Sequence, residues 1–188
     1  MSTMFETALT NPTYLKHVLD QAKLSPQQQS SQNFLVCDEP IEATIDILTK
    51  GPATITELGA GLGALTQALL QRNWHVKAIE RDHQLAQLLP TLMPARNRSR
   101  LTLIADDLKK ADWTWSTPYQ LVGNIPYHLS GLILRRLTTL APVPVTAVIL
   151  MQQEVALRLT AQPPAMNLLA LTIQLWGKAH MVLTIPPS

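Results

Sequence analysis

The sequence predicts an α/β fold, with a mostly parallel, twisted sheet that carries helices on both faces. Short runs of β-forming residues alternate with segments of helical periodicity along the chain. The connections between them are short, which is typical of a parallel sheet. Right-handed crossovers between the strands then give a doubly wound, Rossmann-like arrangement. The length of 188 residues suits one domain with a real core.

Six segments have the composition of strands, and six have the periodicity of helices. The predicted strands cover residues 54–58, 75–80, 101–104, 119–122, 145–151 and 168–176. The predicted helices cover residues 11–23, 40–48, 64–72, 82–89, 129–137 and 153–160. Asn11 and Asp82 are residue types that cap helix N-termini. The segment 145–151 is continuously apolar, so we expect it to be a central strand.

The chain is expected to have an N-terminal part and a main domain. The polar stretch 25–31 indicates a linker, so residues 1–31 are interpreted as a helix with its linker and residues 32–188 as the domain. Lys178 and His180 interrupt the longest apolar stretch, 168–187, which therefore predicts a buried strand and not a membrane span. The N-terminus has no basic segment followed by an apolar run, so no secretory signal is visible and we expect a cytoplasmic protein.

Net charge, cysteine content and histidine spacing indicate which partners, cross-links and metal sites to expect. The net charge of +2 is weakly basic and does not by itself argue for a nucleic-acid partner. The single cysteine, Cys37, excludes an internal disulfide and fits a reducing cytosol; it is expected to be a small buried residue. The five histidines show no metal-ligand spacing, so no metal site is expected.

The candidate functional residues follow predicted strands. Ligands in such folds bind beyond the carboxyl ends of the strands, at the switch in strand order. The glycine-rich turn 57–63, Glu80, Asp106 with Asp107, and the segment 124–127 all stand at such ends. Gly59, Gly61 and Ala64 also satisfy the dinucleotide fingerprint, and Glu80 lies about 20 residues further on, so an NAD site is a competing hypothesis.

Two features favour S-adenosylmethionine over NAD. Glu57 precedes the first glycine, where it can order the turn and balance a sulfonium and an amino group but would repel a pyrophosphate. Asn124-Ile125-Pro126-Tyr127 closes the fourth predicted strand. The Asn124 side-chain carbonyl and the Ile125 backbone carbonyl can each accept an N–H from an adenine amine, while Tyr127 can stack on the base. Catalysis would then consist mainly of positioning and electrostatics, without a metal.

These motifs together resemble the KsgA/Erm family of rRNA adenine N6-dimethyltransferases. The matching segments are residues 32–35 (QNFL), 57–66, 79–80, Asp107, 124–127, 151–155 and 185–188. The resemblance implies an S-adenosyl-L-methionine cofactor and places Asn33 and Leu35 beside it, Gly59 at its methionine part, Glu80 at its ribose and Asp107 at its adenine. The cofactor-binding set it implies is Asn33, Leu35, Glu57, Gly59, Gly61, Glu80, Asp107 and Asn124. Asn124, Ile125, Pro126 and Tyr127 would form the catalytic segment, with Asn124 facing the methyl group and the target base.

The later motifs resemble the KsgA branch, which methylates two adjacent adenines near the 3′ end of small-subunit rRNA. Ribosomal RNA or the small ribosomal subunit is therefore the expected partner, and a role in ribosome biogenesis is implied. The family continues past the PPS motif, so this chain is expected to lack the family's last strand and C-terminal helical domain. We expect the edge left at 168–185 to favour self-association.

Other functions remain open at this point. They are an Erm-type enzyme acting on large-subunit RNA, a ribosome-assembly factor that retains the cofactor site, and an NAD-dependent oxidoreductase. The basic clusters Arg96-Arg98-Arg100, Lys109-Lys110 and Arg135-Arg136 are interpreted as solvated loops, with phosphate contact as the alternative. Trp113 and Trp115 are expected to pack in the core and not to stack on bases.

Overall fold

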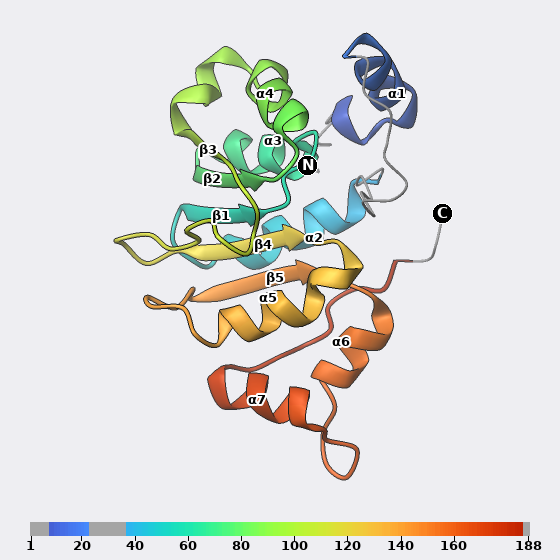
Figure 1. Cartoon of the computed structure of the whole chain (residues 1–188), viewed down its shortest axis with the longest axis vertical. Helices are drawn as coiled ribbons and strands as arrows, with labels where there is room; N and C mark the ends of the chain where they lie inside the picture. The colour runs from blue at the N-terminus through green and yellow to red at the C-terminus, as the bar shows by residue number, and fades with distance from the viewer. Residues whose placement is uncertain (1–7, 23–36, 186–188) are drawn as a thin grey trace.

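Five parallel strands form a single sheet in the order β3-β2-β1-β4-β5 in the computed structural model, which describes residues 8–22 and 37–185 (Figure 1). The strands are β1 (Thr54–Leu58), β2 (His75–Glu80), β3 (Leu101–Ala105), β4 (Gln120–Asn124) and β5 (Thr146–Leu150). All four neighbouring pairs are parallel. The strand order reverses between β1 and β4, so the ligand crevice of this fold class is expected at the carboxyl ends of these two strands. The predicted Rossmann-like sheet is confirmed.

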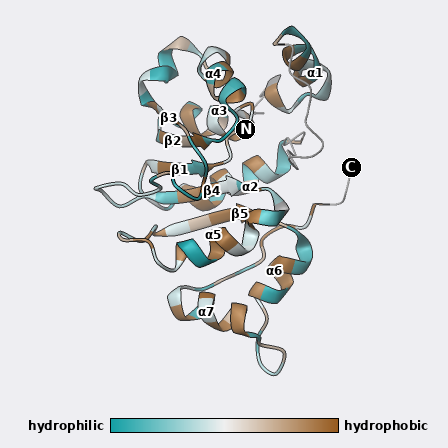
Figure 2. Cartoon of the chain, viewed as in Figure 1, coloured by the Kyte–Doolittle hydropathy of each residue, from teal (hydrophilic) through white to brown (hydrophobic). Residues whose placement is uncertain are grey.

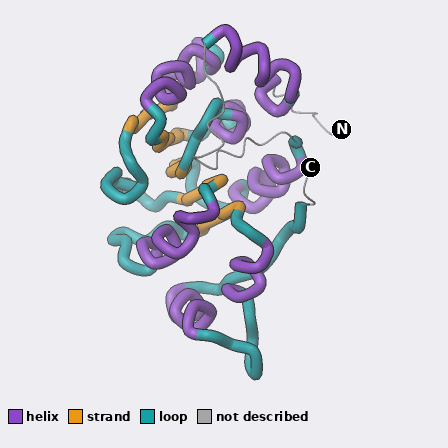
Figure 3. Tube along the Cα trace, turned by 45° about the vertical axis from the view of Figure 1, so that its right-hand side comes forward, coloured by secondary structure: helices purple, strands orange, loops and turns teal. Residues whose placement is uncertain are grey.

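Helices lie on both sides of the sheet (Figure 3). They are α1 (Pro12–Gln21), α2 (Glu39–Leu48), α3 (Ala64–Gln71), α4 (His83–Leu92), α5 (Ser130–Leu137), α6 (Gln153–Leu159) and α7 (Leu168–Trp176), with short 3-10 helices η1 (Ala8–Thr10), η3 (Ala95–Arg100) and η4 (Tyr127–Leu129). The Asn11 side chain accepts N–H bonds from Thr13 and Tyr14, and Asp82 accepts them from Gln84 and Leu85, so both predicted caps are confirmed. No helix in the described part of the chain has the length and apolarity to cross a bilayer.

Two apolar clusters fill the core, one on each face of the sheet. Ile55 and Val122 belong to the first cluster, together with buried residues of α1 to α4. Leu58 and Leu121 belong to the second, together with residues of α5 to α7 and of the loop that follows β3. Because strand side chains alternate in direction, the central strands contribute to both clusters. The division at residue 31 stays a prediction, and within the described residues α1 packs into the first cluster.

The predicted central position of segment 145–151 is wrong. Among the described strands, β5 has β4 as its neighbour and forms an edge of the sheet. Its apolar sequence has another cause, since Val148 packs against the first cluster and Ile149 against the second. Coverage of both faces makes a strand continuously apolar even when one of its edges has no partner strand.

The predicted last strand, 168–176, is also wrong, because these residues form helix α7. The Asn167 side chain accepts the N–H of Ala170 at 3.1 Å and caps the helix. Ala170 and Ile173, three residues apart, form its buried face. A short apolar run does not distinguish a buried strand from a helix by periodicity. The self-associating edge expected at 168–185 therefore has no basis as a strand, although α7 is strongly hydrophobic (Figure 2).

Cys37 is exposed and not buried, because it precedes α2 and lies outside both core clusters. The linker predicted at 25–31 lies outside the described residues.

Candidate functional site

The turn between β1 and α3 depends on glycine. Gly59, Gly61 and Gly63 all have positive φ angles, of 74°, 57° and 87°. A Cβ atom at Gly59 would lie 3.3 Å from the backbone oxygen of Asn124, so the turn runs close to the end of β4. The N–H groups of Gly59 and Ala60 both donate to the carbonyl of Ile79, at 2.9 and 3.2 Å. Strands β1, β2 and β4 thus hold the turn against the sheet, and backbone lines the space beside it.

Glu80, the last residue of β2, faces this turn. Its Oε2 accepts the N–H of Gly61 at 2.8 Å, and its Oε1 accepts the N–H of Asp82 at 2.8 Å. The side chain is buried, and burial raises the pKa of its carboxyl, while the backbone hydrogen bonds from Asp82 and Gly61 act in the opposite direction. The carboxylate has further lone pairs for a ligand hydroxyl.

Glu57 is more deeply buried, with 2% of its surface exposed. Its Oε2 accepts a hydrogen bond from the Thr66 hydroxyl at 2.6 Å, which links β1 to the first turn of α3. Burial raises the pKa of Glu57 to about 8, and the nearby Glu80 adds to the rise. The carboxyl is therefore mostly protonated near neutral pH in this fold. It orders the turn as expected, but its charge argues less strongly against a pyrophosphate than the sequence implied.

Asp107 is the second residue of the connection from β3 to β4, residues 106–119, which we call the β3–β4 loop. Asp107 Oδ1 accepts the N–H of Lys109 at 2.8 Å, and the Asp107 carbonyl accepts the N–H groups of Lys110 and Ala111, each at 2.9 Å. The Asp106 side chain in turn accepts the N–H of Asp107 at 2.7 Å. These bonds fold the start of the loop into a tight turn at the carboxyl end of β3.

The segment Asn124 to Tyr127 leaves β4 beside the glycine turn. Asn124 is the last residue of β4, Ile125 is buried, and the carbonyl of Pro126 accepts the N–H of Leu129 at 2.9 Å. The segment therefore turns directly into η4 and α5. The expected stacking role of Tyr127 concerns a side chain outside the described part of the structure, and Asn33 and Leu35 also lie outside the described residues.

One cavity of about 350 Å³ brings these groups together. Eight of the predicted site residues line it: Glu57, Gly59, Gly61, Glu80, Asp107, Asn124, Ile125 and Pro126. Its volume is in the range of small-molecule sites. Bare glycine backbone, two acids at strand ends and apolar walls suit a ligand that has both hydroxyls and a flat ring. The residues present thus fit a nucleoside-containing cofactor.

Other residues of this cavity were not predicted from the sequence. Leu9 of η1 and Leu15 of α1 line the cavity, although both lie more than one element before the glycine turn in the chain. The cavity is also lined by His83, Gln84 and His128. The helical periodicity of residues 11–23 predicts a helix but does not mark a site. His83 and Gln84 follow the capping residue Asp82 at the carboxyl end of β2, a position that could have been inferred.

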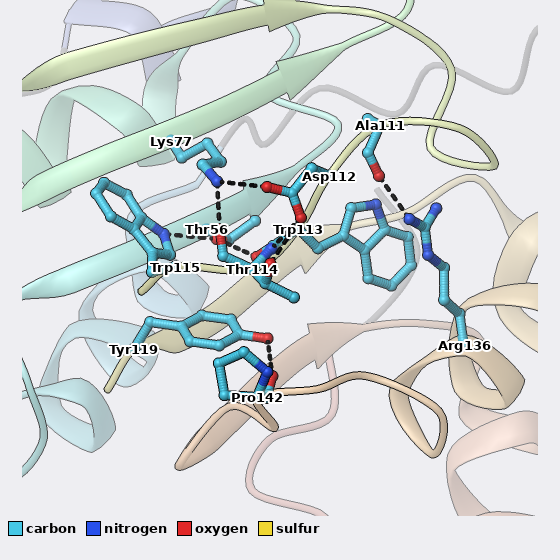
Figure 4. A network of polar contacts seen from close by, with 10 residues as sticks. All are labelled: Thr56, Lys77, Ala111, Asp112, Trp113, Thr114, Trp115, Tyr119, Arg136 and Pro142. Atoms are coloured by element: carbon cyan, nitrogen blue, oxygen red, sulfur yellow. Dashed lines mark hydrogen bonds and ion pairs between the residues drawn. The ribbon is translucent and has the colours of Figure 1, made fainter. Parts of the chain in front are cut away.

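Several of the basic and aromatic residues between the strands have structural partners. Arg98 donates to the carbonyl of Met93 at 3.0 Å, and Arg100 donates to the side-chain oxygens of Asn73 and Asn97. Trp113 is fully buried, which confirms its expected packing role. Arg136 donates to carbonyls of the β3–β4 loop, and Trp115 of that loop donates its indole N–H to Thr56 of β1 (Figure 4).

Comparisons with known proteins agree with this geometry. The model of the family described as "Ribosomal RNA adenine dimethylase" matches residues 6–188. The chain is 34% identical over 168 residues to the ribosomal RNA small subunit methyltransferase A of Thiobacillus denitrificans, covering 87% of this chain and 65% of that protein. It is 33% identical to the protein of the same name from Magnetococcus marinus, covering 93% of this chain and 64% of the relative.

Solved structures show the same fold. A dimethyladenosine transferase from Plasmodium falciparum matches with a TM-score of 0.58 and 22% identity, over 89% of this chain and 52% of that one. The 23S rRNA methyltransferase ErmE matches with a TM-score of 0.61 and 25% identity, over 77% of this chain and 57% of that one. The chain spans less than two thirds of the length of these curated relatives and solved structures. Since the family model matches nearly all of it, the chain belongs to the ribosomal RNA adenine dimethylase family.

Proposed function

We propose that this chain contains the S-adenosylmethionine site and methyl-transfer centre of an enzyme that dimethylates N6 of adenines in small-subunit ribosomal RNA. The observation that carries the proposal is that Glu80, the glycine turn, Asp107 and Asn124 to Pro126 line the same cavity. The names of the curated relatives support the small-subunit substrate. Residues 32–188 would form this domain, and residues 1–31 its N-terminal extension.

The cofactor would lie along the carboxyl ends of the strands. Glu80 would accept the ribose hydroxyls, the Gly59 backbone would face the methionine part, and Asp107 would meet the adenine. Glu57 and Gly61 would shape the turn, and Asn33 and Leu35 would border the cofactor from the preceding segment. S-adenosylmethionine supplies a methyl group activated by its attachment to a sulfonium.

Asn124 and Ile125 would orient the target amine. The nitrogen of an adenine amine is a poor nucleophile, since its lone pair is delocalised into the ring. The side-chain carbonyl of Asn124 and the backbone carbonyl of Ile125 would each accept one N–H and hold the nitrogen in line with the methyl group. Pro126 would fix the turn, and Tyr127 would stack on the base.

An Erm-type activity on large-subunit RNA is a second candidate, favoured by the likeness to ErmE. A transfer assay separates the two when it offers small-subunit particles and large-subunit RNA side by side. The proposal expects incorporation of methyl groups into the small-subunit particles. Preference for large-subunit RNA would instead support the Erm-type activity. Cofactor binding without transfer to either RNA would support an assembly factor.

Asn124→Ala tests the catalytic assignment. Affinity for S-adenosylhomocysteine, measured by calorimetry, should stay near that of the wild type, because Asn124 acts on the target amine. Methyl transfer should fall by roughly 100-fold or more, the cost of losing one oriented group of this kind. Transfer near the wild-type rate would contradict this role, and a chain that binds NAD but not S-adenosylhomocysteine would contradict the proposed function itself.

A further inference from the structure

The β3–β4 loop carries two residues of the cavity, Asp107 and Leu108, but forms no regular element. Its position therefore depends on contacts with other parts of the fold. A loop that holds a ligand-facing carboxylate needs such contacts, because a small displacement of a hydrogen-bonding group weakens its bond steeply. Figure 4 shows polar contacts of this loop, among them those with Thr56 and Lys77 and the hydrogen bond from Arg136 to Ala111.

The second half of the loop is anchored to the sheet. Thr56 of β1 donates its hydroxyl to the carbonyl of Trp113 at 2.8 Å and accepts the indole N–H of Trp115 at 2.9 Å. Lys77 of β2 forms an ion pair with Asp112 at 3.2 Å and lies 5.1 Å from the centre of the Trp115 ring. These contacts fix residues 112–115, which do not line the cavity.

The first half is bound by Arg136, in the last turn of α5. Its Nη1 donates to the carbonyl of Leu108, and its Nη2 donates to the carbonyl of Ala111 at 2.5 Å. Its guanidinium carbon lies 4.3 Å from the centre of the Trp113 ring. The flat guanidinium thus spans two carbonyls and stacks on a buried indole at the same time, a combination that lysine cannot reproduce.

The two residues that Arg136 binds are both linked to Asp107, one as its neighbour in the chain and one by a backbone hydrogen bond. Leu108, whose carbonyl Arg136 binds, is the next residue, and it lines the cavity itself. Ala111, whose carbonyl Arg136 also binds, donates its N–H to the carbonyl of Asp107 at 2.9 Å. Arg136 therefore binds carbonyls near both ends of the short turn formed by residues 107–111.

We propose that Arg136 is a positioning residue that sets the cofactor's adenine specificity by fixing Asp107 and Leu108 at the cavity. The inference rests on the proposed function, in which Asp107 meets the adenine. Asp107 Oδ1 accepts the N–H of Lys109, and the carboxylate has further lone pairs that would accept the exocyclic amine of adenine. Arg136 acts through the backbone of this turn and does not touch the cofactor. Since α5 follows directly on residues 124–129, the same helix links the adenine end of the site to the catalytic segment.

The test compares two ligands that differ at the edge of the base that Asp107 would read. S-adenosylhomocysteine carries an amine at position 6 and an unprotonated N1, whereas S-inosylhomocysteine carries a carbonyl oxygen at position 6 and a proton on N1; the Asp107→Ala variant isolates the part of the preference that depends on Asp107. The wild-type chain should prefer the adenine form by about tenfold or more, the effect of a hydrogen bond to a charged group. Arg136→Lys keeps the charge but cannot donate to both the Leu108 and the Ala111 carbonyl in the same way. The preference for the adenine ligand should therefore fall to about threefold or less.

Arg135 provides the matched control, since it is the neighbouring arginine on the same helix and its side chain is exposed. Arg135→Lys should keep the wild-type preference. Asp107→Ala should lose the preference by itself, and adding Arg136→Lys to it should change the ratio no further, because Arg136 acts through Asp107. Thermal unfolding of each variant, measured in parallel, reports any loss of stability separately from the ligand ratio.

Three results with the variants would overturn the proposal. They are an unchanged preference in Arg136→Lys, an equal loss of affinity for both ligands with the ratio preserved, and a further loss of preference when Arg136→Lys is added to Asp107→Ala. A wild-type chain that binds neither ligand would contradict the proposed function, whereas a wild-type chain that binds both equally would overturn the specificity proposal alone.

Discussion

Glu80 and Gly61 are joined by a hydrogen bond of 2.8 Å from the Gly61 N–H to the Glu80 carboxylate, which links the end of β2 to the glycine turn that follows β1. The positive φ of Gly61 turns the backbone so that this N–H faces the acid. A carboxylate placed in this way holds the turn and also lines the cavity. The group proposed to bind the ribose is therefore already positioned by the backbone that surrounds it.

Glu80→Ala should weaken binding of S-adenosylhomocysteine by about 10- to 100-fold. The substitution removes the acceptor for the ribose hydroxyls and leaves the Gly61 and Asp82 N–H groups without their carboxylate partner. Calorimetry measures the affinity. Glu42→Ala is the control, because Glu42 is an exposed glutamate on α2. Equal affinities of the two variants would remove Glu80 from the proposed site.

Sequence reasoning predicted the centre of the fold well, because several local signals agreed there. The bounds of β1 and β2 match the predictions, and the glycine turn with Glu80 was located from the rule that ligands bind beyond strand carboxyl ends. Asp107 and Asn124 follow the same rule. Their convergence on one cavity follows from the parallel sheet, in which all carboxyl ends meet along the same side.

The failures occurred where tertiary contacts decide the structure. The apolar run of α7 fitted a strand or a helix equally well, and the apolar β5 was mistaken for a central strand because both of its faces are covered. Arg136 was interpreted as part of a solvated pair, since no local pattern shows that it binds carbonyls far along the chain. Leu9 reaches the cavity only because α1 packs onto the first core cluster.

Exposed leucines on α7 predict self-association through a helix surface, and not through the unpaired edge strand expected from the sequence. Leu168 is 79% exposed and Leu175 is 81% exposed. They are seven residues apart on one face of the helix, and exposed apolar side chains that share a face favour association. The wild-type chain should therefore show a mass that increases with concentration in sedimentation experiments. The double substitution Leu168→Lys and Leu175→Lys should shift it towards the monomer.

Thr172→Lys is the control for added charge, since Thr172 is already an exposed polar residue of α7. It should leave the association of the wild type in place. A monomeric wild-type chain at all concentrations would show that the α7 surface does not drive association.

Leu15 should contribute to ligand affinity as well as to stability. Leu15 is 5% exposed, packs in the first core cluster and lines the cavity, whereas Leu19 on the same helix packs in that cluster without lining the cavity. Leu15→Ala and Leu19→Ala should each lower the free energy of unfolding by about 2–4 kcal/mol. Only Leu15→Ala should also weaken S-adenosylhomocysteine binding measurably. Equal affinities would show that α1 supports the fold but not the site.

Glu57 should make the stability of the protein depend on pH. Burial raises the pKa of its carboxyl to about 8 in the folded state, above the ordinary value of 4.5. Between these two values the folded chain holds a proton that the unfolded chain has released. The stability contributed by this proton is fully present below about pH 4.5 and is lost as the pH rises towards about 8.

Glu57→Gln isolates this effect, since the glutamine is neutral at every pH and its carbonyl can still accept the Thr66 hydroxyl. Urea unfolding at about pH 5 and about pH 9 measures the free energy of unfolding of each form. Wild type should lose stability relative to Glu57→Gln as the pH rises between these values. Burial also raises the pKa of Glu80, so both wild type and Glu57→Gln should lose some stability as the pH rises. The difference between their free energies of unfolding therefore reports the contribution of Glu57. Glu42→Gln, an exposed control, should follow the wild-type profile. A constant difference between the free energies of unfolding of wild type and Glu57→Gln from about pH 5 to about pH 9 would mean that Glu57 is ionised in the folded protein. The charge of Glu57 would then argue against a pyrophosphate as strongly as the sequence implied.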